Sequence, residues 1–370
     1  MTRRTLDVHD LAEFDHHARR ATSMAGWFLQ SVDLGDRSAE LRRLEPAGAV
    51  FLGCELSDAD ADSVRSRGAL VFPRLPGLPF DPYRGALYTA EELYALAPGA
   101  PARWTDSPDA AVYTWWRAQG PAAGLAATLA TSLHDHAVGD ALDEALAALA
   151  APVVGVMGGH AVGRDSQEYA AAARLGRELA AAGRVVLTGG GPGAMEAANL
   201  GARMAGRGAA DLEAALAVLA TAPRFTPSVD DWVAAAAEVL RRWPVEGPVP
   251  SLGIPTWFYG HEPPNLFAGG VAKYFANALR EDVLLQRCRG GLVYLPGAAG
   301  TVQEIFQAST AGYYAASPEQ VTPLVLVGRE HWTSVLPAWP LLQALGRGRS
   351  MGERLHLVDD VDEACALLLG

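Results

Sequence analysis

Two glycine-rich segments constrain the fold of this chain most strongly. Residues 189–195 (GGGPGAM) follow the apolar run 185–188, and residues 296–304 (PGAAGTVQE) follow the run 291–295. Short apolar runs that alternate with helical patterns through short turns are typical of parallel βαβ units. Similar apolar runs occur at 153–157, 254–259 and 323–327. The sequence therefore predicts an α/β fold, with a Rossmann-like open parallel sheet and helices on both faces.

The order of these patterns along the chain predicts two domains. A boundary is expected near Pro152, between an N-terminal α/β accessory region, 1–150, and a nucleotide-binding domain, 151–370, with a helical insertion near 207–250. The accessory region would serve regulation or oligomerisation. In the second domain, helices are expected at 166–182, from 195, at 267–286 and from 301. No tandem repeat is evident in the sequence.

Composition narrows the classes of partner. The net charge of −12 disfavours a nucleic-acid groove, which needs clustered cations, and leaves small molecules as the expected ligands. The three cysteines are scattered, which predicts a reducing, cytoplasmic compartment and no zinc site. No apolar run is long enough to span a membrane. Neither a metal nor a resident cofactor is expected.

The first glycine segment has a chemical and a structural interpretation. Glycines at 189, 190, 191 and 193, between a strand and a helix, would expose backbone amides to a phosphate. The same glycines could simply let the helix pack close to the sheet. The segment lacks the dinucleotide pattern G-x-G-x-x-G and the lysine of a P-loop.

The second glycine segment introduces a hydroxyl and a carboxylate. Thr301 and Glu304 form T-x-x-E, which is a helix capping box in one interpretation and part of a reaction centre in another. Both interpretations stay open from local sequence. Because ligands in open α/β folds bind beyond the carboxyl ends of strands, two such turns in one sheet favour a ligand site.

Together the two segments resemble the LOG family, whose pattern is GGGxxGxM followed by PGGxGTxxE. Residues Gly189, Gly190, Gly191, Gly193 and Met195 match the first motif, and Pro296, Gly297, Gly300, Thr301 and Glu304 match the second. Ala298 replaces a family glycine. The resemblance covers about residues 152–330. It implies a phosphoribohydrolase acting on cytokinin riboside 5′-monophosphates, or a nucleotide 5′-monophosphate nucleosidase.

The resemblance also implies an arginine on the helix before the second motif, and Arg280 stands sixteen residues before Pro296, one more than the family spacing. Lys273, Asn277 and Arg280 would share a polar helix face. That face would either orient a nucleotide or be solvated surface.

Other polar turns lie near these motifs in sequence. Gly158 and His160 follow the run 153–157, where the family loop faces the nucleotide, although an ordinary loop histidine fits equally well. Residues 261–265 (HEPPN) form a polar segment that could line the same crevice. A metal site there lacks a third ligand at suitable spacing.

The resemblance implies hydrolysis of the N-glycosidic bond of a nucleoside 5′-monophosphate, giving free base and ribose 5-phosphate. Glu304 would stabilise the positive charge that develops on the sugar or activate water, and Arg280 would orient the nucleotide. The alternative is a non-catalytic nucleotide- or cofactor-binding regulatory protein on the same fold. A homo-oligomer, dimer or larger, is expected by family analogy.

Overall fold

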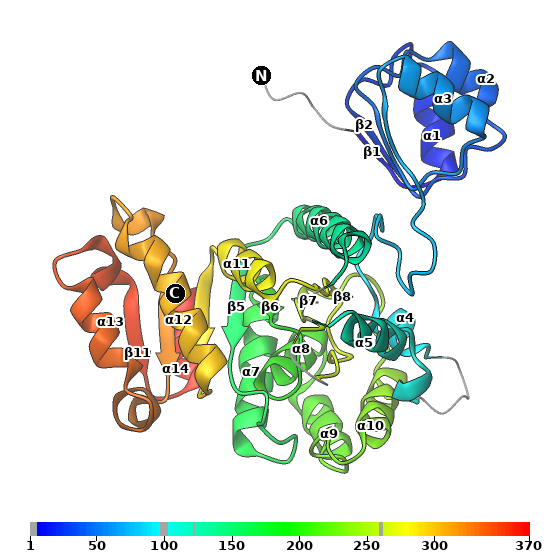
Figure 1. Ribbon diagram of the computed structural model, residues 1–370. Coiled ribbons are helices and arrows are strands. Elements are labelled where there is room, and N and C mark those ends of the chain that lie inside the picture. The colour runs from blue at the N-terminus through cyan, green and yellow to red at the C-terminus, as the bar shows by residue number, and fades with distance from the viewer. Residues whose placement is uncertain (1–5, 97–102, 121–122, 259–261) are drawn as a thin grey trace. The chain divides into compact units, whose positions relative to one another are not determined.

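The computed structural model describes residues 6–96, 103–120, 123–258 and 262–370 (Figure 1). The chain forms two compact units. The first contains the residues up to 86 together with 118–141, and the second contains 87–117 and 142–370. Residues 87–117 thus belong to the second unit although they precede Pro152. The long helix α6 (Leu125–Leu149) contributes residues to both units.

The first unit is a parallel repeat of strands and helices. Its sheet has the order β1-β2-β3-β4, and neighbouring strands are consecutive in sequence. The elements are β1 (Leu6–Val8), α1 (Leu11–Ala18), β2 (Trp27–Gln30), α2 (Ser38–Arg43), β3 (Val50–Leu52), α3 (Asp58–Ser66) and β4 (Leu70–Phe72). Leu6 pairs with Trp27, Phe28 with Val50, and Val50 with Leu70, so each repeat advances by 20 to 22 residues.

Equivalent side chains join successive repeats of this unit. The guanidinium of Arg43 donates to the carbonyls of Ala18 and Ala21 at the end of α1. In the next repeat, Arg67 donates to the carbonyls of Leu41 and Leu44 at the end of α2. The expectation of no tandem repeat is therefore wrong. The repeat is hidden in the sequence because it is carried by buried apolar positions and by two arginines, within otherwise different segments.

The second unit is built on seven parallel strands in the order β11-β10-β9-β5-β6-β7-β8. The strands are β5 (Val153–Met157), β6 (Val185–Thr188), β7 (Ser251–Gly253), β8 (Gly270–Val271), β9 (Gly291–Tyr294), β10 (Leu324–Val327) and β11 (Leu355–Val358). The central strands are buried almost throughout, as their continuous apolar runs require when helices cover both faces of a sheet.

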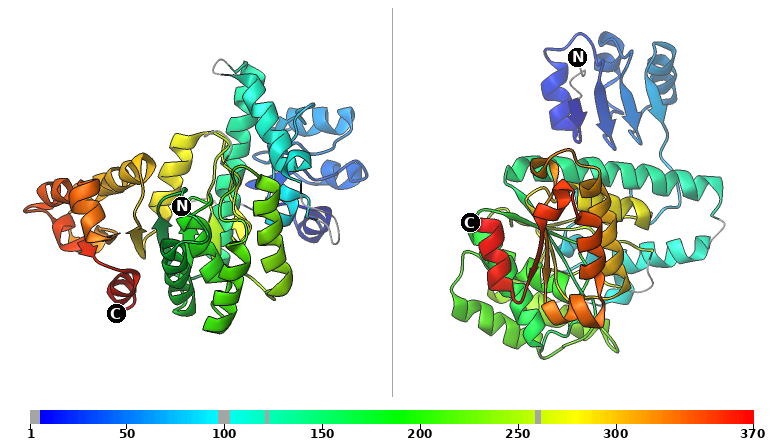
Figure 2. Two further views of the ribbon diagram at one scale, coloured as in Figure 1. Left: turned by 90° about the horizontal axis from the view of Figure 1, so that it is seen from below. Right: turned by 90° about the vertical axis from the view of Figure 1, so that its left-hand side faces the viewer.

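Helices cover both faces of this sheet (Figure 2, right). One face carries α7 (Gln167–Ala181), α8 (Ala194–Arg203) and α14 (Val361–Leu369), and the other carries α11 (Asn277–Arg287), α12 (Ala299–Tyr313) and α13 (Ala338–Gly346). The helices α9 (Ala209–Leu219) and α10 (Val229–Arg242) follow α8 in the span where the sequence predicts an insertion. The predicted open parallel α/β sheet is confirmed.

Two predicted elements between the glycine segments are wrong in position. The strand expected at 254–259 lies earlier in the sequence, as β7, and ends at Gly253. The amide of Ile254 makes the last hydrogen bond to β6, at Thr188, because Pro255 has no N–H to continue the ladder. The helix expected at 267–286 begins only at Asn277. The preceding backbone pairs instead with residues 255–257, through bonds such as the amide of Tyr274 to the carbonyl of Pro255.

Lys273 consequently does not lie on a helix. Its ammonium is buried and stands 2.6 Å from Oδ1 of Asp109, on helix α5 (Pro108–Gln119). Asp109 also accepts hydrogen bonds from the indoles of Trp104 and Trp257. This ion pair, together with the β-bridge of Tyr88 to Val271, joins residues 87–117 to the edge of the sheet beside β7 and β8. The segment also includes the short helix α4 (Ala90–Tyr94).

Candidate functional site

The strand order of the second unit defines where a ligand would bind. From β5 the chain runs outward through β6, β7 and β8, then crosses to the other side of β5 for β9, β10 and β11. Connections on either side of such a switch point diverge, which leaves a crevice beyond the carboxyl ends of the two strands. Here the switch point lies between β5 and β9. The turns after β5 and β9, with the turn after β6, are therefore the candidate site.

The three turns pack directly against one another. A Cβ atom on Gly193 would lie 2.4 Å from the carbonyl oxygen of Gly159, and one on Gly158 would lie 2.9 Å from the Cβ of Ala194. On the other side, the amide of Gly159 donates to the carbonyl of Pro296 at 3.1 Å. Glycine is thus needed at these positions for close approach, and Gly193 also has φ +74°. The turn 158–160 is held between the two glycine loops.

The first glycine loop, residues 189–193, presents backbone donors that have no partner among the described residues. Within the described residues, the amides of Gly191 and Gly193 make no hydrogen bond, and neither do those of Met195 and Glu196 at the start of α8. Gly190 adopts φ +70° against Pro255. The thioether of Met195 packs beside Gly189, where a Cβ would lie 2.8 Å from its sulfur. The loop therefore offers amides to a ligand while Met195 fills the space beneath.

The second glycine loop, residues 296–300, presents a longer row of amides that have no partner in the described part of the chain. In the described part of the chain, no hydrogen bond is made by the amides of Gly297, Gly300 and Thr301, nor by those of Ala298 and Ala299 between them. The carbonyl of Gly297 accepts from Nε2 of His331, which lies on the π-helical turn η3 (His331–Val335) after β10. Unpaired amides at the start of a fifteen-residue helix form a favourable place for an anion.

The capping-box interpretation of Thr301 and Glu304 is wrong. The N-cap of α12 is Ala298, so Thr301 is the third helical residue, and its side chain is packed beside Gly297 instead of capping the helix. Ala298 itself has φ −121°, a conformation that any L-residue adopts, so its methyl group causes no backbone strain. The departure from the family pattern at this position therefore places no strain on the backbone.

Arg280 and Glu304 are brought together from neighbouring helices. Nη1 of Arg280 lies 3.6 Å from Oε1 of Glu304, with side chains 9% and 12% exposed. The other side of the guanidinium faces Oδ1 of Asn277 at 2.9 Å and the carboxylate of Glu281 at 3.7 Å. The same Nη1 would be 3.6 Å from a Cβ on Gly189. Arg280 is thus buried beneath the first glycine loop, and the interpretation of its face as solvated surface is wrong.

The environment of Glu304 favours its protonated form. Burial raises the pKa of this carboxyl from 4.5 to about 7; the Arg280 guanidinium opposes that shift, and the Glu281 carboxylate adds to it. Desolvation therefore outweighs the attraction of the single arginine. A carboxyl group with a pKa near neutrality can donate or accept a proton under ordinary conditions, which is the property required of a general acid or base.

His160 and Glu262 lie at the rim of the first glycine loop. Nδ1 of His160 is 3.6 Å from Oε1 of Glu262, and both side chains are partly exposed. Oε2 of Glu262 would lie 3.7 Å from a Cβ on Gly191. Of the segment expected to line the crevice, Glu262 lies at the rim of the first glycine loop, whereas Asn265 is buried and bonds the loop through the carbonyl of Gly191. His261 lies outside the described residues.

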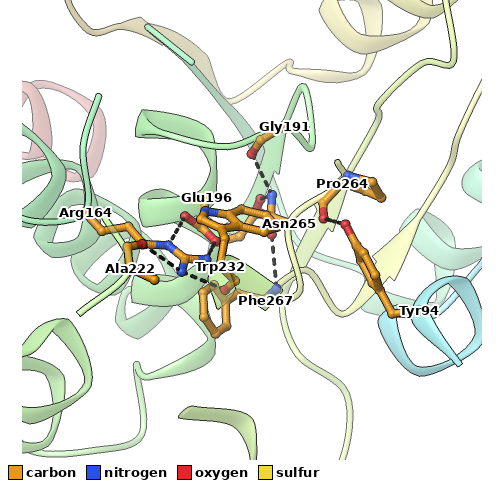
Figure 3. A network of polar contacts seen from close by, with 10 residues as sticks. Tyr94, Arg164, Gly191, Glu196, Ala222, Trp232, Pro264, Asn265 and Phe267 are labelled. Carbon is orange, nitrogen blue, oxygen red and sulfur yellow. Dashed lines mark hydrogen bonds and ion pairs between the residues drawn. The ribbon is translucent and has the colours of Figure 1, made fainter. Parts of the chain in front are cut away.

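A buried ion pair supports the start of α8 and was not recognised in the sequence (Figure 3). The guanidinium of Arg164 donates from Nε to Oε2 of Glu196 at 2.9 Å and from Nη2 to Oε1 at 2.6 Å, and both side chains are fully buried. Arg164 also donates to the carbonyl of Trp232 at 2.8 Å and lies over its indole. The available sequence signal was Glu196, a carboxylate in the first turn of a helix in an otherwise apolar segment.

The comparisons with known proteins concern this second unit. Residues 151–209 match the SLOG cluster4 family. The match contains the first glycine motif and ends before the second. It confirms the resemblance at the level of the SLOG superfamily, which includes LOG-like Rossmann-fold proteins. No curated protein sequence matches the chain.

Solved structures with a similar arrangement include two molybdenum cofactor proteins. The molybdenum cofactor binding protein from Rippkaea orientalis is 20% identical, with a TM-score of 0.35, and the match covers 59% of this chain and 95% of that one. The molybdenum cofactor carrier protein from Chlamydomonas reinhardtii is 20% identical, with a TM-score of 0.37, covering 59% and 96% of the two chains.

Two further classes of feature are absent from the described ranges. No group of three or more His, Cys, Asp or Glu side chains there is placed to hold a metal ion. No helix there combines the length and apolar character needed to cross a membrane.

Proposed function

We propose that this protein binds a nucleoside 5′-monophosphate across the turns that follow β5, β6 and β9, with the phosphate on the start of α12. The observation that carries the proposal is the row of unpaired amides at 297–301 beside the switch point of the sheet. The fifteen-residue helix behind them adds the positive end of its dipole. The rest of the ligand would extend over the turn 158–160 toward the first glycine loop.

Ala298 offers a sharp test of the phosphate position. It is exposed and is the N-cap of α12. Asp and Asn are both favourable N-cap residues, so Ala298→Asp and Ala298→Asn should leave the fold intact. Only the aspartate places a negative charge where the phosphate would lie. The measurement is isothermal titration calorimetry of both variants and the parent with AMP, CMP, GMP and UMP, and with adenosine as the ligand without phosphate.

The expected result is that the parent binds at least one monophosphate more tightly than its nucleoside. Ala298→Asp should weaken that binding by at least about tenfold relative to Ala298→Asn, since a like charge at this distance costs on the order of 1–2 kcal/mol. Equal affinity of the two variants would place the phosphate elsewhere. Failure of the parent to bind any monophosphate would refute the proposed function.

Hydrolysis of the bound nucleotide is a second candidate function, favoured by Glu304. Breaking an N-glycosidic bond leaves positive charge on the sugar and requires a proton for the departing base and a water for the anomeric carbon. In its carboxylate form Glu304 would stabilise that charge or take a proton from water. Arg280, which is held by Asn277 and Glu281, would orient the nucleotide beside it.

The two candidate functions are separated by product analysis. Incubation of the parent with each monophosphate, followed by chromatography for free base, should release base if hydrolysis occurs. Glu304→Gln keeps the shape of the side chain but removes its ionisable carboxyl group. It should therefore abolish base release while nucleotide binding remains. The exposed change Glu213→Gln on α9 is the control for a substitution outside the three turns. Binding without base release in the parent would leave the regulatory, non-catalytic function as the conclusion.

A further inference from the structure

Asn265 holds the first glycine loop from behind (Figure 3). This residue is 1% exposed and lies between β7 and β8. Its backbone amide donates to the carbonyl of Gly190 at 2.9 Å, and its Nδ2 donates to the carbonyl of Gly191 at 3.2 Å. One asparagine therefore fixes two consecutive carbonyls of the loop.

The geometry of the peptide bond determines the direction in which the amide of Gly191 points. In a trans peptide unit the C=O and the following N–H point in opposite directions. Since the carbonyl of Gly190 points at Asn265, the amide of Gly191 points away from it. Gly191 is buried, and its amide makes no hydrogen bond within the described residues. A buried donor of this kind needs a partner, which a bound ligand would supply.

The orientation of the Asn265 side chain is itself fixed by a buried network. Its Oδ1 accepts from the amide of Phe267 at 3.1 Å, and its Nδ2 also donates to Oδ1 of Asn199 at 3.0 Å. Asn199 is in turn held by Thr188 at 2.7 Å and by Ser251 at 2.5 Å. Exchanging the oxygen and nitrogen of the Asn265 amide would set acceptor against acceptor at Gly191. The network therefore specifies one orientation.

Glu262 determines what kind of ligand group suits this amide. Its Oε2 would lie 3.7 Å from a Cβ on Gly191, and its side chain is 34% exposed. The carboxylate of Glu262 beside the first loop repels a phosphate. The carboxyl group near the second loop, Glu304, is one turn into α12 and is paired with Arg280. A backbone amide of Gly191 and a carboxylate close to the same residue match a hydroxyl group, which both accepts and donates.

We propose that Asn265 sets the first glycine loop as the subsite for the sugar hydroxyls of the ligand, which bind between the amide of Gly191 and the carboxylate of Glu262. Asn265 is a positioning residue in this arrangement, because it acts through the loop. The proposal rests on the proposed function and divides the site between the two loops. The second loop takes the phosphate, and the first takes the neutral, hydrogen-bonding sugar.

The test compares three ligands on three proteins. The ligands are AMP, 2′,3′-dideoxy-AMP and inorganic phosphate, and the proteins are the parent, Asn265→Asp and Thr256→Val. Asn265→Asp keeps the shape of the side chain but replaces the donor to Gly191 by an acceptor. Thr256→Val is the matched control, since it removes buried hydrogen bonds to Tyr274 and Phe258 near the same sheet edge without altering a bond to either glycine loop.

The parent should bind AMP at least tenfold more tightly than the dideoxy analogue. Asn265→Asp should weaken AMP binding about tenfold, change phosphate binding less than twofold, and reduce discrimination between AMP and the analogue to less than threefold. Thr256→Val should keep the parent's discrimination even if its melting temperature falls. Unchanged discrimination in Asn265→Asp, or equal loss of AMP and phosphate binding, would overturn the inference. A parent that binds AMP without discrimination would overturn the inference alone, whereas a parent that binds none of AMP, CMP, GMP and UMP would refute the proposed function as well.

Discussion

Replacing Glu304 by glutamine should stabilise this protein at neutral and alkaline pH. The carboxyl group is buried beside a single arginine, and its pKa is raised from 4.5 to about 7, chiefly by burial. Glutamine has nearly the same shape and carries no charge at any pH. Arg280 keeps its contacts with Asn277 and Glu281 in the variant. The cost of burying the carboxylate would therefore disappear without leaving the arginine unpaired.

The sign and size of the effect follow from linkage. Below about pH 4.5 the carboxyl is protonated in both the folded and the unfolded chain, and its contribution to stability is fully present. Between 4.5 and about 7 the unfolded chain releases the proton first, so the free energy of unfolding falls as pH rises. Above about 7 the loss is complete. The difference between a pKa of 4.5 and one of about 7 corresponds to about 3 kcal/mol, because a tenfold change in an equilibrium constant is about 1.36 kcal/mol.

Urea denaturation of the parent and Glu304→Gln, at pH values from 5 to 8.5, measures this difference. The free energy of unfolding of the variant relative to the parent should increase across this range by about 2–3 kcal/mol. The exposed change Glu213→Gln is the control and should show no such increase. A difference between variant and parent that stays constant with pH would refute the reasoning. Stabilisation together with loss of base release would mark Glu304 as a residue kept for function at the expense of stability.

Three further changes test the structures that support the site. Arg164→Met should destabilise the second unit by about 3–5 kcal/mol because it leaves Glu196 buried without its partner, and adding Glu196→Leu should recover part of that loss in thermal denaturation. Gly193→Ala places a side chain at φ +74° and in contact with the neighbouring turn, so it should abolish AMP binding in calorimetry; retained binding would contradict the packing of the turns. Lys273→Met should cost about 3–5 kcal/mol by leaving the buried Asp109 carboxylate with its indole donors but without a cation, and a melting temperature unchanged from the parent would show that this ion pair contributes nothing.

The sequence alone determined the strands β5, β6, β9 and β10 and the two glycine loops of the second unit. Strand β5 occupies the predicted residues, and α7 begins one residue later than expected, because both rest on local signals: a continuous apolar run, and a serine cap before an amphipathic stretch. The two glycine segments were likewise recognised from local sequence, since glycines closely spaced between an apolar run and a helical pattern indicate a short turn from strand to helix. Assembly as a homo-oligomer and the cytoplasmic compartment stay predictions.

Only the tertiary structure decided the roles of side chains whose partners are far apart in sequence. The sequence placed Thr301 and Glu304 equally well in a cap or in a reaction centre, until the start of α12 at Ala299 removed the cap. Asn265 looked like part of a polar loop, yet its role comes from carbonyls 74 and 75 residues earlier. Likewise, the pKa of Glu304 depends on burial and on a neighbouring helix. Glycine and hydrophobic patterns act through neighbours along the chain, whereas the chemistry of a buried polar group depends on which distant groups folding brings against it.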